Sequence, residues 1–193
     1  MLGKEVTPVT VAKDLGICID QSLTYNDHIT KTASCLHKLI QINRIKHLLD
    51  KKTLILLMNC FIFSRLLYCS TVWSNTSRSN IIIKKLQLVQ NFAARIVLGL
   101  RKFDHISQGI RSLNWLPVCE RLYLIDAIMI FKCIHNLVLD YLYIRSQTNI
   151  RNTRQSNHLN ILRCRLATSQ CSFSYRGAKL WSNLSNDLKD EIL

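Results

Sequence analysis

Residues 80–98, NIIIKKLQLVQNFAARIVL, form the stretch that decides the fold class of this 193-residue chain. Its apolar residues recur at helical spacing. The inward side of the expected helix would carry Ile82, Leu86, Val89, Ala93, Ile96 and Val97. Gly99 follows directly, where a glycine in the left-handed conformation commonly ends a helix. The pattern therefore predicts a helix over 80–98 that packs against other apolar helices.

The sequence on either side predicts more helices. Thr24 with Asp27 three residues later has the form of an N-terminal capping signal, so we expect a helix over about 25–47. Asp50 is a second candidate cap, ahead of a long apolar helix that would end near Trp73. Shorter or later helices are expected within 104–114, from Val118 to Leu137 after Pro117, and from Phe173 to Leu184.

The remaining sequence completes the expected fold. Residues 9–19 carry β-branched side chains in near alternation around Gly16, which is typical of a short strand or hairpin arm. Only 5 Gly and 2 Pro interrupt the chain, which favours long helices. We therefore expect a mainly α fold, a bundle of four to five helices with a short N-terminal β-strand or hairpin and an irregular basic C-terminal segment. The expected division is a strand or hairpin in 1–22, a helical domain in 23–140, and a basic linker or arm with a short terminal helix in 141–193.

Charge points to a polyanionic partner. Lys and Arg total 26 against 12 acidic residues, a net charge of +14. Residues 28–103 hold a single acid, Asp50, and residues 141–186 hold none. Such stretches suit phosphate contacts in RNA or DNA, although solvated helix faces would look the same. The candidate contacts are Lys31, Lys38, Arg44, Lys46, Arg95, Arg101, Lys102, Arg151, Arg154, Arg163, Arg165 and Arg176.

Aromatic residues lie beside some of these cations. Phe103 follows Arg101 and Lys102, and Trp181 follows Arg176 and Lys179. Aromatic rings can stack on bases while the cations neutralise phosphates. The alternative is that Phe103, Trp115, Phe173 and Trp181 are core residues around which the basic side chains extend. For the tryptophans we favour the core.

No constellation of catalytic or cofactor-binding residues is found. Two-metal nucleotidyl transfer requires neighbouring carboxylates, and the chain has no Asp-Asp pair. The sequences GxxxxGK[ST], GxGxxG and HExxH are also absent. His158, Cys164 and Cys171 are too few and too widely spaced for a structural zinc site. We therefore expect no catalytic residue, no metal and no cofactor.

The eight cysteines are scattered without a CxxC pair, and most lie in apolar helical segments. Free thiols of this kind indicate a reducing compartment, either nucleus or cytoplasm. Residues 54–73 have the length of a membrane span, but Arg65 near the middle makes insertion costly. A buried helix is the better interpretation, so no membrane association is expected.

Several sequence blocks resemble the region after the polymerase core of non-LTR (LINE-type, jockey-like) retrotransposon reverse transcriptases. The first is KDLGI at 13–17 with Asp20, followed by LTY at 23–25 and His28-Ile29. Later blocks, in family order, are FSRL at 63–66 with Tyr68 and Val72-Trp73; LQ at 86–87 with VQN at 89–91, Ala94-Arg95 and Gly99; Leu113 with WLPV at 115–118 and Arg121; and SF at 172–173 with YRG at 175–177 and Leu180-Trp181.

The resemblance implies that 1–22 is the end of a palm-type hairpin and that the helices form a thumb-like domain of an RNA-directed DNA polymerase. Such a domain would hold a template–primer duplex by its backbone. The polymerase core and its catalytic Asp pair are missing from these residues, so the resemblance implies no enzymatic activity. We also expect self-association through apolar faces that the polymerase core would otherwise cover.

A helical protein-interaction domain without a nucleic-acid role is the alternative function. Its binding to another protein would survive high salt, whereas phosphate binding would weaken steeply. The choice between RNA and DNA stays open, because backbone contacts discriminate poorly.

Overall fold

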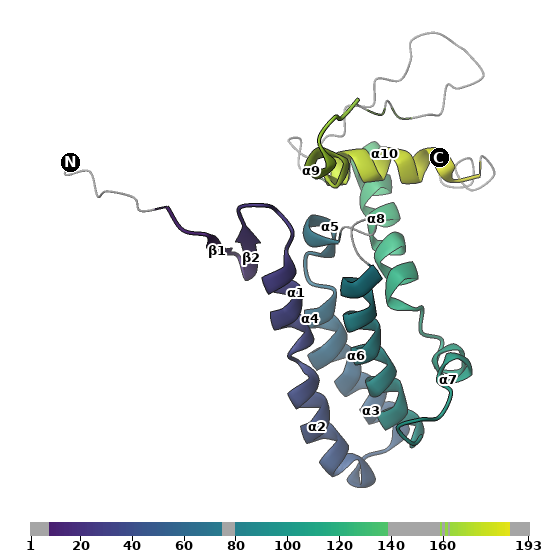
Figure 1. Cartoon of the computed structure of the whole chain (residues 1–193). Helices are drawn as coiled ribbons and strands as arrows, with labels where there is room; N and C mark the ends of the chain where they lie inside the picture. The colour runs from purple at the N-terminus through teal and green to yellow at the C-terminus, as the bar shows by residue number, and fades with distance from the viewer. Residues whose placement is uncertain (1–7, 75–79, 139–158, 160, 162, 186–193) are drawn as a thin grey trace. The chain divides into compact units, whose positions relative to one another are not determined.

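The computed structural model describes residues 8–74, 80–138, 159, 161 and 163–185 (Figure 1). They form a mainly α structure that begins with a two-stranded hairpin, as the sequence predicted. The chain makes two compact units. Unit 1 consists of Met1–Cys69 and Ile81–Trp115, and unit 2 of Ser70–Asn80 and Leu116–Leu193. The domain division expected from the sequence remains a prediction.

Unit 1 opens with strands β1 (Val11–Asp14) and β2 (Ile17–Asp20), which pair antiparallel with Val11 opposite Asp20. Leu15 and Gly16 form the two-residue turn, and both have positive φ angles, 43° and 89°. Such a turn follows the natural twist of a hairpin, and glycine adopts it at no steric cost. Ile17 and Cys18 of β2 are buried, so the hairpin is attached through its second strand, which contacts the following helix.

The helix expected over 25–47 is divided in two, α1 (Asn26–Ala33) and α2 (Leu36–Ile45), followed by a 3-10 turn at Lys46–Leu48. The Ser34 hydroxyl lies 2.6 Å from the Lys31 carbonyl, a local hydrogen bond that competes with helix continuation. The Thr24 cap is also wrong, because no side chain caps α1. Asp20 instead accepts hydrogen bonds from the backbone amides of Ser22, Thr24 and Tyr25.

The long apolar helix expected up to Trp73 is likewise interrupted. It consists of α3 (Lys51–Met58), a π-helical segment (Asn59–Phe63) and α4 (Ser64–Leu66). After Leu67 the chain turns at Cys69, whose φ is 48°, and α5 (Ser70–Trp73) belongs to unit 2. The Asp50 cap is confirmed: its carboxylate accepts from the amides of Lys52 and Thr53.

Helix α6 (Asn80–Leu98) has the bounds that the sequence predicted. Leu86, Val89 and Ala93 are fully buried on its inward side. Gly99 ends it at φ 68°, and the amides of Gly99 and Leu100 donate to the carbonyls of Ile96 and Arg95. This is the Schellman arrangement.

Unit 1 closes with α7 (Ser107–Ser112), inside the range expected for a short helix. Trp115 follows it and is buried, and its ring meets Phe63 edge-on at 4.8 Å between centroids. The core role favoured for this tryptophan is confirmed. Phe103 was the opposite case: its core alternative is wrong, because 89% of the residue is exposed.

Unit 2 contains α5, α8 (Val118–Ile134), α9 (Ala167–Gln170) and α10 (Phe173–Asn183). Helix α8 ends three residues before the predicted Leu137, because Asn136 adopts a left-handed φ of 54°. Pro117 precedes the first turn, and Ser172 caps α10 by accepting from the Tyr175 amide. Helix α8 contacts both α5 and α10, and the buried residues Ile130, Leu159, Ala178 and Trp181 form one apolar cluster.

Candidate nucleic-acid interface

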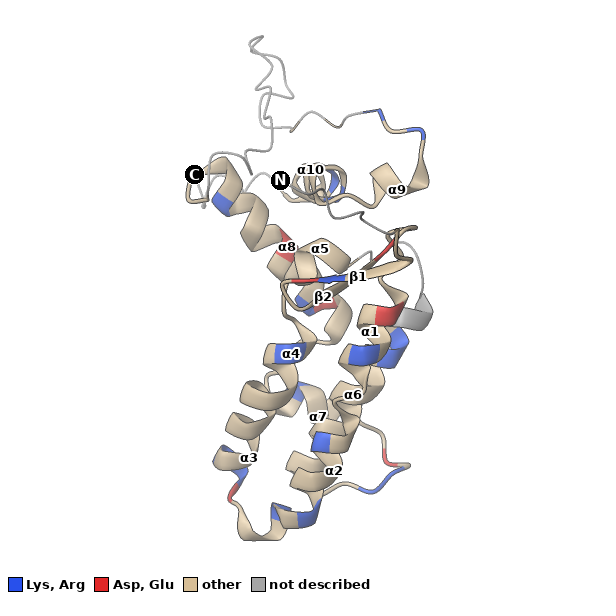
Figure 2. Cartoon of the chain, turned by 90° about the vertical axis from the view of Figure 1, so that its left-hand side faces the viewer, with Lys and Arg blue, Asp and Glu red and all other residues tan. Residues whose placement is uncertain are grey.

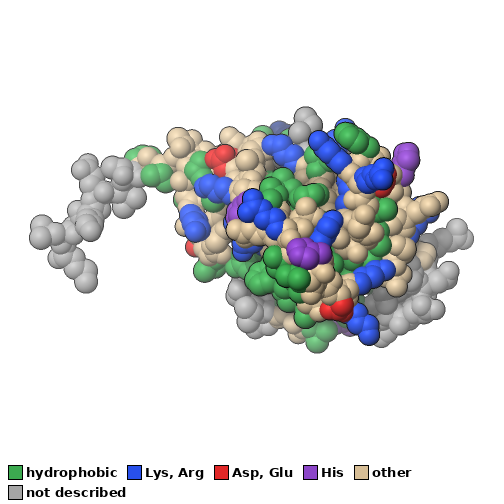
Figure 3. Space-filling view, turned by 90° about the horizontal axis from the view of Figure 1, so that it is seen from below, with side chains coloured by type: hydrophobic (Ala, Val, Ile, Leu, Met, Phe, Trp, Pro, Cys, Tyr) green, Lys and Arg blue, Asp and Glu red, His purple; other side chains and the backbone are tan. Residues whose placement is uncertain are grey.

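One end of unit 1 is rich in basic residues. The turn between α2 and α3 and the loop at 99–106 after α6 lie at the same end in both ribbon views (Figures 1 and 2). We call this region the basic end and define it by six residues on these segments: Arg44, Lys46, Lys51, Lys52, Arg101 and Lys102. All are exposed except Lys46, which is half-buried. Figure 3, seen from below, shows Lys and Arg side chains spread among hydrophobic ones, with few carboxylates.

Two carboxylates, those of Asp50 and Asp104, lie on the segments of the basic end, and both accept hydrogen bonds from backbone amides. The Asp50 carboxylate accepts a hydrogen bond from the Lys52 amide at 3.1 Å and another from the Thr53 hydroxyl. These hydrogen bonds, that of the Thr53 hydroxyl first, hold the pKa of Asp50 below its ordinary value. Asp104 accepts from the Arg101 amide at 2.7 Å. Neither carboxylate forms an ion pair with a described Lys or Arg, so the cations of the basic end keep their charge for an external partner.

The same holds for unit 1 as a whole. Its described residues include fourteen Lys and Arg but only five acids, all aspartates. Within those residues no Lys or Arg pairs with a carboxylate. Asp20 also serves the backbone, because it binds three amides and the Thr24 hydroxyl. Burial is the largest single effect on the pKa of Asp20 and raises it, but these hydrogen bonds together outweigh burial and lower that pKa below its ordinary value.

A second basic region is a pocket of about 580 Å³ beside the hairpin. Lys13 of β1, Lys31 of α1 and Arg65 of α4 line it, together with the hydroxyl residues Thr32, Ser64 and Tyr68. The Lys31 ammonium lies 3.3 Å from the Cys18 sulfur. Among the residues that the structure describes, no acidic side chain lines the pocket. The three hydroxyls already donate to the backbone carbonyls of His28, Cys60 and Leu15. The ammonium and guanidinium groups around the hollow are therefore the donors that suit the oxygens of a phosphate group.

His28 also lines this pocket, and burial sets its protonation state. Burial, with the charge of Lys31 as a second cause, lowers the pKa of His28 below its ordinary value. The imidazole is therefore neutral at neutral pH and adds no positive charge. Its Nδ1 faces the Cys18 amide at 3.5 Å, which links α1 to β2. His28 thus positions the wall of the pocket.

Five of the predicted contacts fall in these two regions: Arg44, Lys46, Arg101 and Lys102 at the basic end, and Lys31 in the pocket. The candidate contacts expected from the sequence did not include Lys13 and Arg65 of the pocket, or Lys51 and Lys52 of the basic end. In the sequence, Arg65 was an obstacle to membrane insertion and a residue of the FSRL block, although an arginine inside an apolar helix is itself a signal of function or pairing. Lys13 lies in the KDLGI block and was used only to recognise it.

Two further candidates in unit 1 have local contacts. Lys38 of α2 places its ammonium 5.7 Å from the centre of the Phe61 ring, a cation–π contact at the surface. Arg95 of α6 donates from Nη2 to the Asp104 carbonyl at 3.2 Å. Arg95 therefore acts on the loop that carries Arg101 and Lys102, and is a positioning residue for it.

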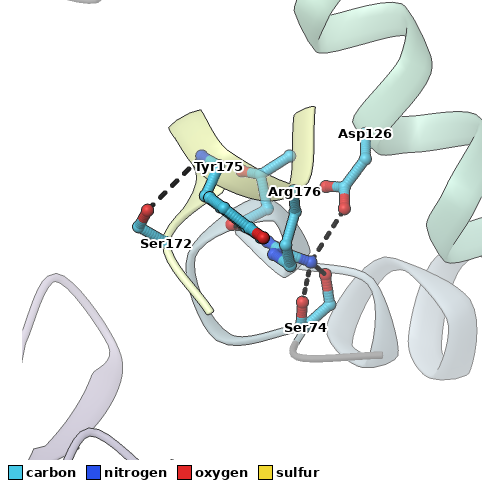
Figure 4. A network of polar contacts seen from close by, with 6 residues as sticks. Ser74, Asp126, Ser172, Tyr175 and Arg176 are labelled. Atoms are coloured by element: carbon cyan, nitrogen blue, oxygen red, sulfur yellow. Dashed lines mark hydrogen bonds and ion pairs between the residues drawn. The ribbon is translucent and has the colours of Figure 1, made fainter. Parts of the chain in front are cut away.

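Arg176 lies inside unit 2, and its side chain is only 10% exposed (Figure 4). Its guanidinium pairs with Asp126 of α8 at 2.9 Å and donates to the Thr71 carbonyl at 2.8 Å. It also donates to the hydroxyl and the carbonyl of Ser74. With Nη1 and Nη2 directed to these partners, Arg176 joins α10 to α8 and α5 and does not present its charge to a phosphate.

The other candidates of the C-terminal part are divided by what the structure describes. Arg163 and Arg165 are exposed ahead of α9 in unit 2. Arg151 and Arg154 lie outside the described residues, as does His158 of the weak metal set.

Among the described residues, no group of three or more His, Cys, Asp or Glu side chains is placed to hold a metal ion. The helices in the described part of the chain are too short or too polar to cross a bilayer. What the described residues do present is basic surface, with Lys13, Lys31 and Arg65 in the lining of the pocket.

No family model matches the chain, and neither a curated protein nor a solved structure matches it. The resemblance to non-LTR retrotransposon reverse transcriptases therefore remains a prediction from the sequence blocks.

Proposed function

We propose that this chain is a thumb-like region of a non-LTR retrotransposon reverse transcriptase, which binds nucleic acid by its phosphate backbone and does not catalyse nucleotidyl transfer. The binding surface would comprise the basic end and the hairpin pocket of unit 1. The single observation that carries the binding proposal is that carboxylates of unit 1 are hydrogen-bonded to the backbone and not paired with cations. Asp20, Asp50 and Asp104 bind backbone amides, which leaves the surrounding cations without acidic partners.

The chemistry of these side chains favours recognition of the backbone over that of bases. Lysine is a flexible point charge, and phosphate contacts fix a protein on nucleic acid without reading its sequence. Each neutralised phosphate releases condensed counterions, which drives binding at low salt. Binding should therefore be independent of sequence and strongly dependent on ionic strength.

The origin of the chain is supported by what the family blocks do in the fold. Gly99 ends α6, Trp115 is buried against Phe63, and Trp181 lies in the apolar cluster of unit 2. Arg176, from the block at 175–177, forms the buried ion pair. Residues that hold a fold together are the ones expected to recur in a family, and this supports the proposed origin.

A salt titration tests the binding proposal. Fluorescence anisotropy with a labelled duplex would be recorded at several NaCl concentrations for the wild-type chain and a Lys46→Gln, Lys51→Gln, Lys52→Gln triple variant. If about six phosphates are neutralised, affinity should fall roughly a thousandfold between about 50 and 200 mM salt. The triple variant should bind more weakly and reduce the slope of log K against log salt by about 0.9 for each lost contact.

A matched control separates the basic end from net charge. Lys132 and Lys179 are exposed in unit 2, and Arg163, a candidate contact from the sequence that is not part of the proposed surface, is a third exposed cation there. A Lys132→Gln, Lys179→Gln, Arg163→Gln variant removes the same charge. It should retain most of the affinity and slope. An equal loss in both variants, or a flat salt response of the wild-type chain, would contradict the proposal.

The second candidate function is a protein-interaction domain, and exposed apolar residues favour it. Leu48, Leu56 and Leu88 of unit 1 are all more than half exposed. Exposed leucines on helices can form a docking surface when they are contiguous. Binding of a protein partner that persists at high salt, with no affinity for nucleic acid, would establish this alternative.

A further inference from the structure

Phe103 has the greatest exposed fraction among the large hydrophobic residues in the described part of the chain, at 89%. Single exposed hydrophobic residues are common and by themselves carry no meaning. Here the ring belongs to the basic end: Arg101 and Lys102 precede it, and both are exposed. The three tryptophans, by contrast, are all buried. An aromatic ring displayed among cations requires an explanation other than packing.

The loop that carries Phe103 is tied down on both sides. The Asp104 amide donates to the Arg101 carbonyl at 3.3 Å, which places Lys102 and Phe103 at the tip of a tight turn. The Asp104 carboxylate accepts a hydrogen bond from the Arg101 amide at 2.7 Å. Arg95 of α6 donates to the Asp104 carbonyl. Upstream, the Schellman arrangement at Gly99 fixes the exit of the chain from α6. The turn is therefore pre-organised, so that little order has to be gained on binding.

The charges around the ring favour an anionic ligand with a flat, polarisable group. The Lys102 ammonium lies 5.4 Å from the centre of the Phe103 ring. The carboxylate in the turn, Asp104, accepts from the Arg101 amide and forms no ion pair with Arg101 or Lys102. A nucleotide offers both partners at once, since its base can stack on the ring while its phosphate meets the cations.

We propose that Phe103 stacks on an unpaired base and that Arg101 and Lys102 contact the adjoining phosphates. The basic end therefore prefers single-stranded nucleic acid to duplex. This inference rests on the proposed binding of nucleic acid and specifies its substrate class. In a duplex the bases are already stacked on one another, and a ring could reach their faces only by forcing a base step apart. In a single strand every base has an accessible face.

The test compares three ligands of equal length, about 12 nucleotides, which is within the span of a single-strand site. They are an oligothymidylate, the same strand with abasic positions, and a duplex. Phe103→Ala should bind the oligothymidylate roughly 5- to 100-fold more weakly than the wild-type chain, the range expected for loss of one stacked base. The same variant should bind the abasic strand and the duplex as the wild-type chain does.

Two further variants complete the design. Phe103→Trp should retain the affinity for the single strand, because the aromatic face is kept. Leu88→Ala removes a comparably exposed apolar residue of α6 and should leave all three affinities unchanged. Since Phe103 is almost fully exposed, its substitution should not unfold the chain, which circular dichroism checks.

The outcomes separate this inference from the function on which it rests. If Phe103→Ala binds the oligothymidylate as tightly as the wild-type chain does, or loses affinity equally for all three ligands, stacking is overturned while salt-dependent binding stands. If no ligand binds in a salt-dependent manner, the proposed function itself fails. If Phe103→Ala instead loses binding only to vesicles containing an anionic phospholipid, the turn is a membrane contact and the inference is wrong.

Discussion

Arg176 and Asp126 form an ion pair in unit 2 whose partners come from distant parts of the sequence. Asp126 lies 50 residues and Thr71 105 residues from Arg176. The Asp126 side chain is only 4% exposed, and its Oδ1 has no hydrogen-bond partner among the described residues. A buried pair contributes little net stability, but removal of one partner typically costs about 3–5 kcal/mol because the other charge is stranded.

Burial raises the pKa of Asp126 to about 6, against the opposing effect of Arg176. In the unfolded chain the carboxyl titrates near its ordinary value of 3.8. Between these two values the folded state binds the proton more strongly, so its stability is greatest at low pH and decreases as pH rises toward 6. The loss should be on the order of 3 kcal/mol and should level off above the folded pKa.

Urea unfolding of the wild-type chain and of Asp126→Asn, followed by circular dichroism from pH 4 to pH 7, measures this contribution. Other groups, His28 among them, titrate in both proteins and cancel in the difference. The free energy of unfolding of the wild-type chain should fall relative to that of the variant across this range. A constant difference would show that the carboxyl has the same pKa folded and unfolded.

The role of Arg176 could not be predicted from its surroundings in the sequence. It lies in a basic stretch without acids, and its partners Asp126 and Ser74 are remote. Only the fold brings them together. The tryptophans were predictable, because large apolar rings are rarely left at a surface without cause, and Trp73, Trp115 and Trp181 are all buried.

At the scale of elements, the sequence predicted helices best where a local stop signal was present. Helix α6 has its predicted bounds, because its apolar spacing is regular and Gly99 ends it. Periodicity alone did not reveal the breaks at Ser34 and Cys69, since the apolar pattern continues through both. At Ser34 the competing signal is one hydroxyl hydrogen bond, and at Cys69 it is a left-handed residue that is not glycine.

The Schellman end of α6 gives a prediction at this scale. At Gly99 an added Cβ would meet no atom within 4 Å, so only the positive φ opposes a side chain. Gly99→Ala should lower the free energy of unfolding by about 1 kcal/mol, and Gly99→Asn by less, because asparagine adopts the left-handed conformation more readily. Denaturant unfolding curves of the three proteins provide the measurement. Equal stability of the alanine and wild-type chains would mean that Gly99 does not hold a left-handed conformation in solution.

The candidate site was also predictable only where its residues are close together in the sequence. Acid-poor stretches identified four cations of the basic end from the sequence, Arg44, Lys46, Arg101 and Lys102, but not Lys51 and Lys52. The hairpin pocket was not identified, because Lys13, Lys31 and Arg65 are far apart in the chain and come together only when β1, α1 and α4 are placed. Asp50 and Asp104 form no ion pairs with these cations because they accept hydrogen bonds from backbone amides. Those hydrogen bonds could not be predicted from the amino-acid composition.

At the scale of the whole molecule, the exposed leucines predict self-association. Leu56 of α3 and Leu88 of α6 are 60% and 63% exposed, and β1 and β2 pair only with each other in the described part of the chain. Apolar surface and open strand edges favour contacts between copies.

Size-exclusion chromatography with light scattering at high salt should show a mass that rises with protein concentration. A Leu56→Gln, Leu88→Gln variant should weaken the association about tenfold or more, since burial of a leucine contributes about 1.5–3 kcal/mol. Lys132→Gln, which changes charge but not apolar surface, serves as the control. A monomer at every concentration would contradict the prediction.

The assignment of α5 to unit 2 has a consequence for synthesis and for cutting the chain. The polypeptide leaves unit 1 after Cys69, returns at Ile81 and leaves again after Trp115. No single cut in the chain therefore separates the units. A protein that ends before residue 176 would lack the Arg176 guanidinium, which donates to the carbonyls of Thr71 and Ser74. During synthesis on a ribosome, about a hundred more residues must be added after 71–74 before Arg176, their hydrogen-bond partner, is present. Completion of unit 2 is thus a late, long-range event, and such loop closures are slow.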